Sequence, residues 1–209
     1  MSKTHNLHGQ SLNVWPDDLD VVQFTEQPPM FYTSFNDTEH YHAPLVERIL
    51  ELEKDKKFTH RMRIGGSKVR DVHRWGIPEA DFLHARALEI FARGVDKKVS
   101  DVKVDVCWAS VSRKHEYLTS HGHYDAMGAV VYMLTPGEKD EDNEFSGRFA
   151  IVDPRVPECC PRQEACPTRE VSPDMKEGAM ILFPADIGHY VHPYTGDAPR
   201  ITIAWNLYF

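Results

Sequence analysis

The sequence has few cysteines and no long apolar run, and each shortage excludes a class of protein. Its 209 residues include four cysteines, too few for a disulfide-rich secreted scaffold. No apolar run approaches the roughly 20 residues that a membrane-spanning helix needs. The first residues, Met1–Asn6, lack the apolar core of a signal peptide. We therefore expect a cytoplasmic protein without a membrane partner.

Basic residues are in the minority, since 24 Lys and Arg face 32 Asp and Glu and give a formal net charge of -8. An acidic chain is a poor match for a nucleic-acid backbone, so we expect no nucleic-acid partner. The basic residues are unevenly spread, because residues 54–74 carry eight Lys or Arg against two Asp. A solvated surface is the preferred interpretation of this basic stretch, and a face that meets an anionic substrate is the alternative.

Three of the cysteines, Cys159, Cys160 and Cys166, fall in a proline-rich segment, residues 154–173. No fourth ligand stands at the short spacing of a structural zinc site, so reduced thiols are preferred over zinc. The segment is too rich in Pro and Cys for regular structure. A loop this long inside a compact domain is typical of a lid or binding loop.

Helix signals dominate residues 40–95. One helix is predicted over residues 43–56, with a proline near its start, and a second has Pro78 near its first turn and Gly94 just past its end. The preceding residues 1–11 are polar, and we expect them to be frayed.

From about residue 100 the pattern changes to short strands separated by turns. Apolar residues first alternate with polar ones, and further strands are predicted around residues 129–134, 148–152, 179–183 and 200–209. Such a series predicts a β-sandwich or barrel. The length suits a single domain over residues 1–209, with a β core at about 100–209 and helical support at about 40–95.

Three potential metal ligands stand at alternate positions in the segment Ser120-His121-Gly122-His123-Tyr124-Asp125. In an extended strand, side chains two apart point to one face, so His121, His123 and Asp125 would converge. A set of imidazole and carboxylate ligands suits Fe(II) and leaves some of its coordination positions open. A solvent-facing strand with alternating polar residues is the alternative.

A second pattern follows near the C-terminus, where an apolar run and a Phe-Pro pair precede His189, and Arg200 follows eleven residues later. The ordered set resembles the Fe(II)/2-oxoglutarate-dependent dioxygenases over roughly residues 100–209. Within them it resembles an oxygenase family marked by His-x-His, Ser-Gly, Phe-x-x-x-Asp-Pro-Arg and Phe-Pro-x-x-x-x-His. In this chain the motifs read His121-Gly122-His123, Ser146-Gly147, Phe149 with Asp153-Pro154-Arg155, and Phe183-Pro184 with His189.

The resemblance implies a mainly β fold with flanking helices, the double-stranded β-helix or jelly roll that cupins share. It also implies Fe(II) and 2-oxoglutarate as cofactors and O2 as co-reactant. The expected activity is that of a dioxygenase, an oxidoreductase that decarboxylates 2-oxoglutarate to succinate. It would hydroxylate an unidentified small molecule or peptide.

The resemblance assigns metal ligands with one ambiguity. His189 follows the Phe-Pro pair at the family's spacing, and His123 serves in either alignment of the first motif. The third ligand is Asp125 under the superfamily's His-x-Asp, or His121 under the nearer family's His-x-His. Asp125 is preferred, because two imidazoles and one carboxylate are the better attested donor set. His121 would then support a metal ligand or face the substrate. His192 would not bind the metal directly.

The same resemblance assigns residues to the cosubstrate. Arg200 suits the distal carboxylate of 2-oxoglutarate, because its planar fork binds a carboxylate through two hydrogen bonds. Thr202 shares the strand face of Arg200. Tyr132 could reach the cosubstrate or could equally be a core residue, and Arg155 is a candidate for substrate contact. The nearer family's Ser-x-x-Ser-Gly is absent after the histidine pair, which leaves the alignment of the metal strand open.

Two rival functions remain. A cupin-like metalloenzyme that does not use 2-oxoglutarate would have no need of the Arg200 anchor. A non-catalytic jelly-roll binding protein with a vestigial site would retain no metal and turn over no 2-oxoglutarate.

Overall fold

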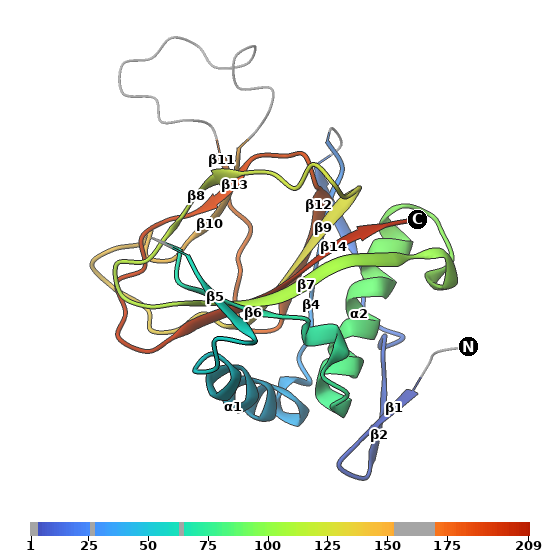
Figure 1. The fold of residues 1–209 in the computed structure, drawn as a ribbon. Coiled ribbons are helices and arrows are strands. Elements are labelled where there is room, and N and C mark those ends of the chain that lie inside the picture. Colours follow the sequence, from blue (N-terminus) through green and yellow to red (C-terminus); the bar gives the residue numbers. More distant parts are fainter. Residues whose placement is uncertain (1–3, 26–27, 63–64, 153–169) are drawn as a thin grey trace.

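A computed structural model describes residues 4–25, 28–62, 65–152 and 170–209, and two antiparallel β-sheets form its centre (Figure 1). Within the described residues the larger sheet contains, in spatial order, β3 (Val22–Thr25), β4 (Met30–Ser34), β12 (Ala179–Pro184), β9 (Gly128–Thr135), β14 (Arg200–Tyr208), β7 (Lys103–Ser112), β6 (Ser67–Arg70) and β5 (Thr59–Arg61). The smaller sheet contains β11 (Glu170–Val171), β10 (Phe149–Val152), β13 (His189–Val191) and β8 (Leu118–His121). The two sheets enclose a common core and form the jelly roll that the sequence predicted.

The larger sheet is buried on both faces. On β14, Ile203 and Trp205 pack in the core between the sheet and the helices, whereas Ala204 packs in the core between the two sheets. On β9, Val131 faces the inter-sheet core and its neighbour Tyr132 faces the helices. Because successive side chains of a strand point to opposite faces, burial on both faces produces continuous apolar runs. The inter-sheet side is called the interior face below.

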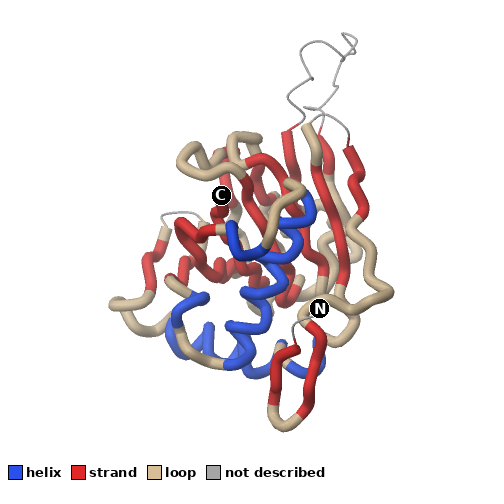
Figure 2. The backbone as a smooth tube through the Cα atoms, turned by 90° about the vertical axis from the view of Figure 1, so that its right-hand side faces the viewer, coloured by secondary structure: helices blue, strands red, loops and turns tan. Residues whose placement is uncertain are grey.

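Two α-helices cover the outer face of the larger sheet, α1 (His42–Leu52) and α2 (Pro78–Gly94) (Figures 1 and 2). Helix α2 begins at a proline, whose fixed φ suits the first helical turn, and acidic Glu79 and Asp81 follow near the positive end of the helix dipole. Both predicted helices are confirmed, although α1 ends at Leu52 rather than near residue 56. Within the described residues no helix combines the length and apolar composition needed to cross a bilayer.

The N-terminal residues form a hairpin, β1 (Thr4–Leu7) and β2 (Gln10–Asn13), next to the helices (Figure 2). The expectation of a frayed start was therefore wrong for residues 4–11. Its turn places His8 and Gly9 at positive φ, as two-residue hairpins require, and Leu7 is buried in the helix-side core. Short 3-10 helices complete the described elements: η1 (Thr38–His40), η2 (Val72–Arg74) and η3 (Val99–Asp101).

Candidate metal centre

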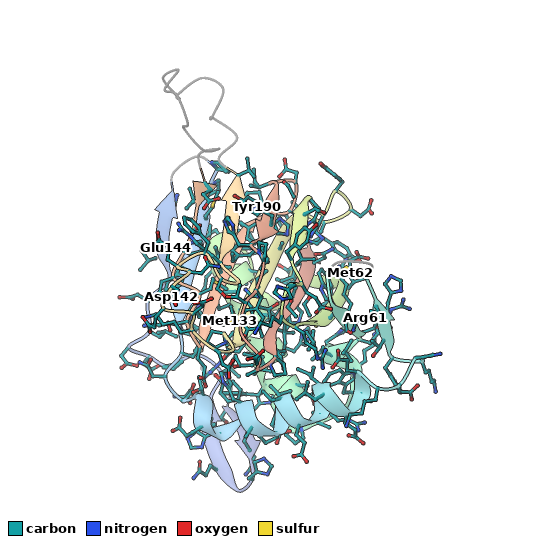
Figure 3. All side chains as sticks on the ribbon, turned by 90° about the vertical axis from the view of Figure 1, so that its left-hand side faces the viewer. Arg61, Met62, Met133, Asp142, Glu144 and Tyr190 are labelled. Carbon is teal, nitrogen blue, oxygen red and sulfur yellow. The ribbon has the colours of Figure 1, made fainter. Side chains whose placement is uncertain are left out.

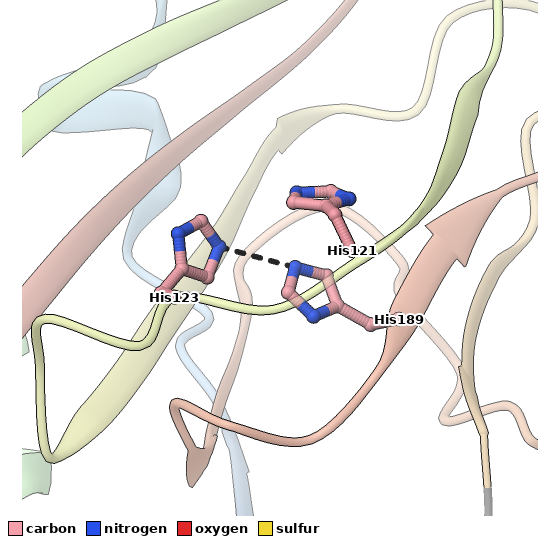
Figure 4. Close-up of side chains that lie close together, drawn as sticks. All are labelled: His121, His123 and His189. Atoms are coloured by element: carbon pink, nitrogen blue, oxygen red, sulfur yellow. Dashed lines mark hydrogen bonds between the residues drawn. The ribbon is translucent and has the colours of Figure 1, made fainter.

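Histidines converge where two neighbouring strands of the smaller sheet meet. β8 ends at His121 and β13 begins at His189, and antiparallel pairing places these residues opposite each other with ring centres 4.3 Å apart. His123 stands two residues beyond His121, so both side chains lie on one side of the chain. Its backbone N–H donates to the carbonyl of Ala185 at 2.6 Å, which ties the segment to the chain before β13. Figure 4 shows the three rings facing one another.

The separation of the ring nitrogens fits a shared metal ion. The Nε2 atoms of His123 and His189 lie 3.2 Å apart, and one ligand nitrogen from each of the three histidines lies within 4.8 Å of the others. Two imidazole nitrogens that bind one divalent ion at about 2.1 Å, roughly at right angles, stand about 3 Å apart. The histidine cluster, defined as His121, His123 and His189, therefore has the spacing of a metal site.

The hydrogen bonds of the rings leave their Nε2 atoms free to bind. His121 Nδ1 lies 2.9 Å from the carbonyl oxygen of Thr119, and His189 Nδ1 lies 3.0 Å from that of Ile187. A carbonyl only accepts, so each Nδ1 carries the proton and each Nε2 keeps its lone pair. An outer partner on the second ring nitrogen is the usual way that proteins orient a metal-binding histidine.

The cluster is also held neutral. Burial lowers the pKa of His123 to about 4 and that of His189 to about 3, and it lowers the pKa of His121 as well. The charge of Lys68 lowers the pKa further at all three rings, and neighbouring rings of the cluster add to the effect at His123 and His189. Neutral imidazole is the form that binds metal, so all three rings are ready to bind at neutral pH.

A buried amide next to His123 supports the same conclusion. Asn206 is 6% exposed; its Nδ2 lies 3.4 Å from His123 Nδ1, and its Oδ1 has no hydrogen-bond partner. Rotation of the amide by half a turn would place Oδ1 against His123 Nδ1 as an acceptor. That arrangement satisfies the orphaned oxygen and puts the proton of His123 on Nδ1, which leaves its Nε2 free. Asn206 thus fits the role of outer partner for the third ligand.

The structure places Asp125 outside the cluster. The strand ends at His121, and the chain turns at Tyr124 and Asp125, whose side chains are exposed. Alternation persists only while the backbone is extended, so it brings in His123 and fails for Asp125. Among the described residues, the one that lies with His123 and His189 at the spacing of a metal site is His121, the alternative third ligand.

Arg200 and Thr202 lie on the interior face of β14, on the same side as Ala204. Arg200 is 3% exposed, and burial lowers its pKa to about 10. The described residues place no carboxylate within ion-pair distance of its guanidinium. A buried cation without a counter-ion is costly, so the position suits an anionic ligand.

The guanidinium of Arg200 borders a pocket of about 360 Å³ between the sheets. Met133 and Glu144, which also line it, are labelled in Figure 3. Gly147 packs so closely that an added Cβ would stand 2.9 Å from Arg200 Cδ, which explains a residue without a side chain here. Phe149 lines this pocket too, and its ring centre lies 5.8 Å from that of His189. The pocket and the histidine cluster therefore share a wall.

Tyr132 is placed away from the site. It lies on the helix side of β9, where its hydroxyl lies 2.6 Å from His42 Nε2 and 2.9 Å from the hydroxyl of Tyr41. Its side chain is fully buried in the helix-side core, which agrees with the core interpretation of Tyr132. His192 lies outside the cluster, with its ring 5.3 Å from that of Phe145. Arg155 and Cys159, Cys160 and Cys166 lie outside the described residues.

Comparisons with known proteins agree with this geometry. The family described as "Putative 2OG-Fe(II) oxygenase" matches residues 106–206, which include every strand from β8 to β13 and all three histidines. The match covers just under half of the chain, and over that range the sequence resembles the Fe(II)/2-oxoglutarate-dependent oxygenases. No curated protein matches the sequence.

Solved structures of low sequence identity share the fold of this chain. AviO1 from Streptomyces viridochromogenes Tue57 is 13% identical with a TM-score of 0.64, over 86% of this chain and 89% of that one. A prolyl-4-hydroxylase from Pseudomonas putida is 13% identical with a TM-score of 0.59, over 85% and 91%. The epimerase SnoN, solved with Fe3+, alpha ketoglutarate and nogalamycin RO, is 12% identical with a TM-score of 0.62, over 85% and 78%.

The sequence analysis missed two residues beside the cluster, Trp108 and Asn206. The ring centre of Trp108 lies 5.5 Å from that of His123, and Asn206 contacts the same histidine. Both lie on the interior faces of adjacent strands, β7 and β14. The one available signal was polarity, since Asn206 interrupts an apolar strand whose other polar residues, Arg200 and Thr202, stand at even spacing before it.

Proposed function

We propose that this oxygenase hydroxylates a carbon atom of its substrate, with Fe(II) held by His121, His123 and His189 and 2-oxoglutarate held by Arg200. The observation that carries the proposal is the convergence of three neutral imidazoles on one point of a jelly-roll interior that also contains an unpaired, buried guanidinium. The name of the prolyl-4-hydroxylase relative and the iron and alpha ketoglutarate in the SnoN structure support the reaction class and the cofactors.

Bound Fe(II) with 2-oxoglutarate supplies the oxidising power that the polypeptide lacks. The overall reaction is R–H plus 2-oxoglutarate plus O2, giving R–OH, succinate and CO2. One oxygen atom enters the product and the other enters succinate. The substrate and 2-oxoglutarate each lose two electrons, which together reduce O2, so the reaction is balanced without a further reductant.

The chain's own residues have three tasks in this proposal. Thr119 and Ile187 hold His121 and His189 by their carbonyl oxygens and fix the direction of each Nε2. Arg200 neutralises the distal carboxylate of 2-oxoglutarate through two parallel hydrogen bonds, and Thr202 adds a hydroxyl donor on the same strand face. The apolar interior face excludes water from the reacting groups.

A site of three histidines leaves the full charge of Fe(II) available to the carboxylate and oxo groups of 2-oxoglutarate, because no protein carboxylate offsets it. In this proposal the third metal ligand is His121 and not Asp125. The choice rests on the cross-strand pairing of His121 with His189. We also propose that the helices and the jelly roll form a single domain, since one core cluster includes residues of both helices and of the larger sheet.

Anaerobic titration tests the proposed function. The protein is first loaded with Fe(II), and 2-oxoglutarate is then added while the visible spectrum is recorded. A charge-transfer band that saturates, followed by succinate formation once O2 is admitted, is the expected result. Iron binding without a band would favour a cupin-like enzyme that does not use 2-oxoglutarate. Absence of iron binding would favour a non-catalytic jelly-roll protein.

A further inference from the structure

A second pocket opens directly beside the histidine cluster. It measures about 320 Å³, large enough for a small molecule, and His123 and Trp108 form part of its wall. Its outer residues include Arg70 and Asp71, which are exposed, so the pocket reaches the surface. It differs from the pocket at Arg200, with which it shares no lining residue. A molecule that enters here would meet the cluster from the side of His123.

The inner wall of this pocket carries a cation without a partner. Lys68 lies on the interior face of β6, since its neighbour Val69 packs in the helix-side core. Among the described residues no carboxylate stands within ion-pair distance of Lys68. Its Nζ instead lies 4.4 Å from the ring centre of Trp108, and burial lowers its pKa. Contact with an aromatic face offsets only part of the cost of a partly buried charge.

Two distances to the indole of Trp108 limit how far Lys68 can lie from the cluster. The ring of Trp108 lies 4.4 Å from Lys68 Nζ and 5.5 Å from the ring centre of His123. The ammonium can therefore be no farther than about 10 Å from that imidazole. A substrate group bound to Lys68 would therefore be separated by only a few bonds from a carbon atom next to the metal.

The mouth of the pocket carries one arginine and one aspartate beside a histidine. His60 and Arg70 stand there, and Arg70 has no ion-pair partner among the described residues. Asp71 is the opposing charge. Four of the lining residues, His60, Lys68, Arg70 and Asp71, belong to the basic stretch of residues 54–74, so part of that stretch lines the pocket rather than only a solvated surface.

Building on the proposed function, we infer that the substrate is a small organic acid whose anionic group binds Lys68, and whose reacting C–H bond lies at the metal side of Trp108. A carboxylate and a phosphate monoester share this chemistry. A neutral sugar or an uncharged peptide segment would leave Lys68 without a counter-ion. The volume of the pocket and the short path from Lys68 to His123 both favour a small molecule over a polymer.

A panel of small carboxylic acids and phosphate monoesters tests the inference. Each carboxylic acid is matched with its own primary amide and each phosphate with its own alcohol, so that the pair members differ in charge. Binding to the Fe(II) protein is followed anaerobically by ligand-observed NMR, which needs no turnover. At least one acid should bind tenfold or more tightly than its neutral partner, because hydrogen bonds to charged groups are stronger than neutral ones. That same acid should accelerate succinate formation, and its partner should not.

Variants identify the residue responsible. Lys68→Met should reduce the preference for the acid to within about twofold of its neutral partner, whereas Lys68→Arg, which keeps the charge, should retain most of it. The matched control is Lys139→Met, which removes an exposed lysine that does not line the pocket and should change nothing. If no acid is preferred over its neutral partner, or if the preference survives Lys68→Met, the inference is wrong.

One further readout separates this inference from the proposed function. The midpoint of the 2-oxoglutarate charge-transfer band should stay within twofold of the wild-type value in Lys68→Met. A tenfold or larger rise would mean that Lys68 binds the cosubstrate, and it would overturn the substrate assignment while leaving the oxygenase assignment intact. A wild-type protein without any band would contradict the proposed function, and the acid preference in the NMR experiment would still decide the role of Lys68.

Discussion

Replacement of Arg200 by methionine should raise the stability of the ligand-free protein and lower its affinity for 2-oxoglutarate. Burial lowers the pKa of Arg200 from 12.5 to about 10. At about 1.4 kcal/mol per unit, this shift means that the buried charge reduces the free energy of unfolding by on the order of 3 kcal/mol. Because the folded-state pKa is the lower one, the penalty is complete below about pH 10 and declines only as pH rises through that value.

Without a charge to bury, Arg200→Met should raise the unfolding free energy of the ligand-free protein by up to about 3 kcal/mol, less any loss from imperfect packing. For a chain of this length, each kcal/mol moves Tm by roughly 2 to 4 °C. The same variant loses the partner of the distal carboxylate. Leaving one member of a buried charge pair alone costs about 3 to 5 kcal/mol, which is roughly a hundredfold or more in 2-oxoglutarate affinity.

Two assays follow these effects. Thermal unfolding of the ligand-free protein reports the gain in stability, and anaerobic titration of the charge-transfer band reports the loss of affinity. Arg200→Lys should recover only part of the affinity, because an ammonium cannot form two parallel hydrogen bonds. Arg93→Met, at an exposed ion pair on α2, is the control and should alter neither quantity much. An unchanged titration midpoint in Arg200→Met would refute the assignment of Arg200 to the cosubstrate.

Three further outcomes are expected. His121→Ala should lose stoichiometric Fe(II) in a metal titration while Asp125→Ala retains it, and the reverse order would restore the carboxylate ligand. His123→Ala and His189→Ala should each lose Fe(II) with little change in circular dichroism; full iron occupancy in either would contradict the site. Tyr132→Phe should lower the unfolding free energy by about 1 to 3 kcal/mol, because it strips buried His42 and Tyr41 of a hydrogen-bond partner, yet leave 2-oxoglutarate affinity unchanged. A large affinity loss in Tyr132→Phe would place that residue at the cosubstrate after all.

The elements that carry the site were predictable where one local pattern determines them. Alternation over β7, the proline at the start of α2 and the ordered motifs from His121 to Arg200 each predicted a feature that the structure contains. The ordered motifs carried the family resemblance that implies a jelly roll. In the structure, β8 and β13 lie side by side and bring the first and last histidine motifs together.

The sequence could not decide placements that depend on where a strand ends or on which face of it a residue occupies. Alternation over residues 121–125 would include Asp125 only if the strand continued, but β8 ends at His121 and the chain turns at Tyr124 and Asp125. Tyr132 lies in a strand buried on both faces, so its apolar neighbours gave no indication of which face it occupies.

The contribution of Lys68 could not be read from the sequence either. It lies in a four-residue strand whose place is set by pairing with β7, about 40 residues later in the chain. In the sequence it is one of eight basic residues in a single stretch. Only the pairing of Lys68 with Ser110, next to Trp108 on the same face, distinguishes it from its solvated neighbours.

A crystal structure of the anaerobic complex with Fe(II) and 2-oxoglutarate tests the central claim most directly. The account predicts iron bonded to Nε2 of His121, His123 and His189, with the distal carboxylate of 2-oxoglutarate on the guanidinium of Arg200. Iron bonded to Asp125 in place of His121, or a cosubstrate carboxylate remote from Arg200, would contradict it.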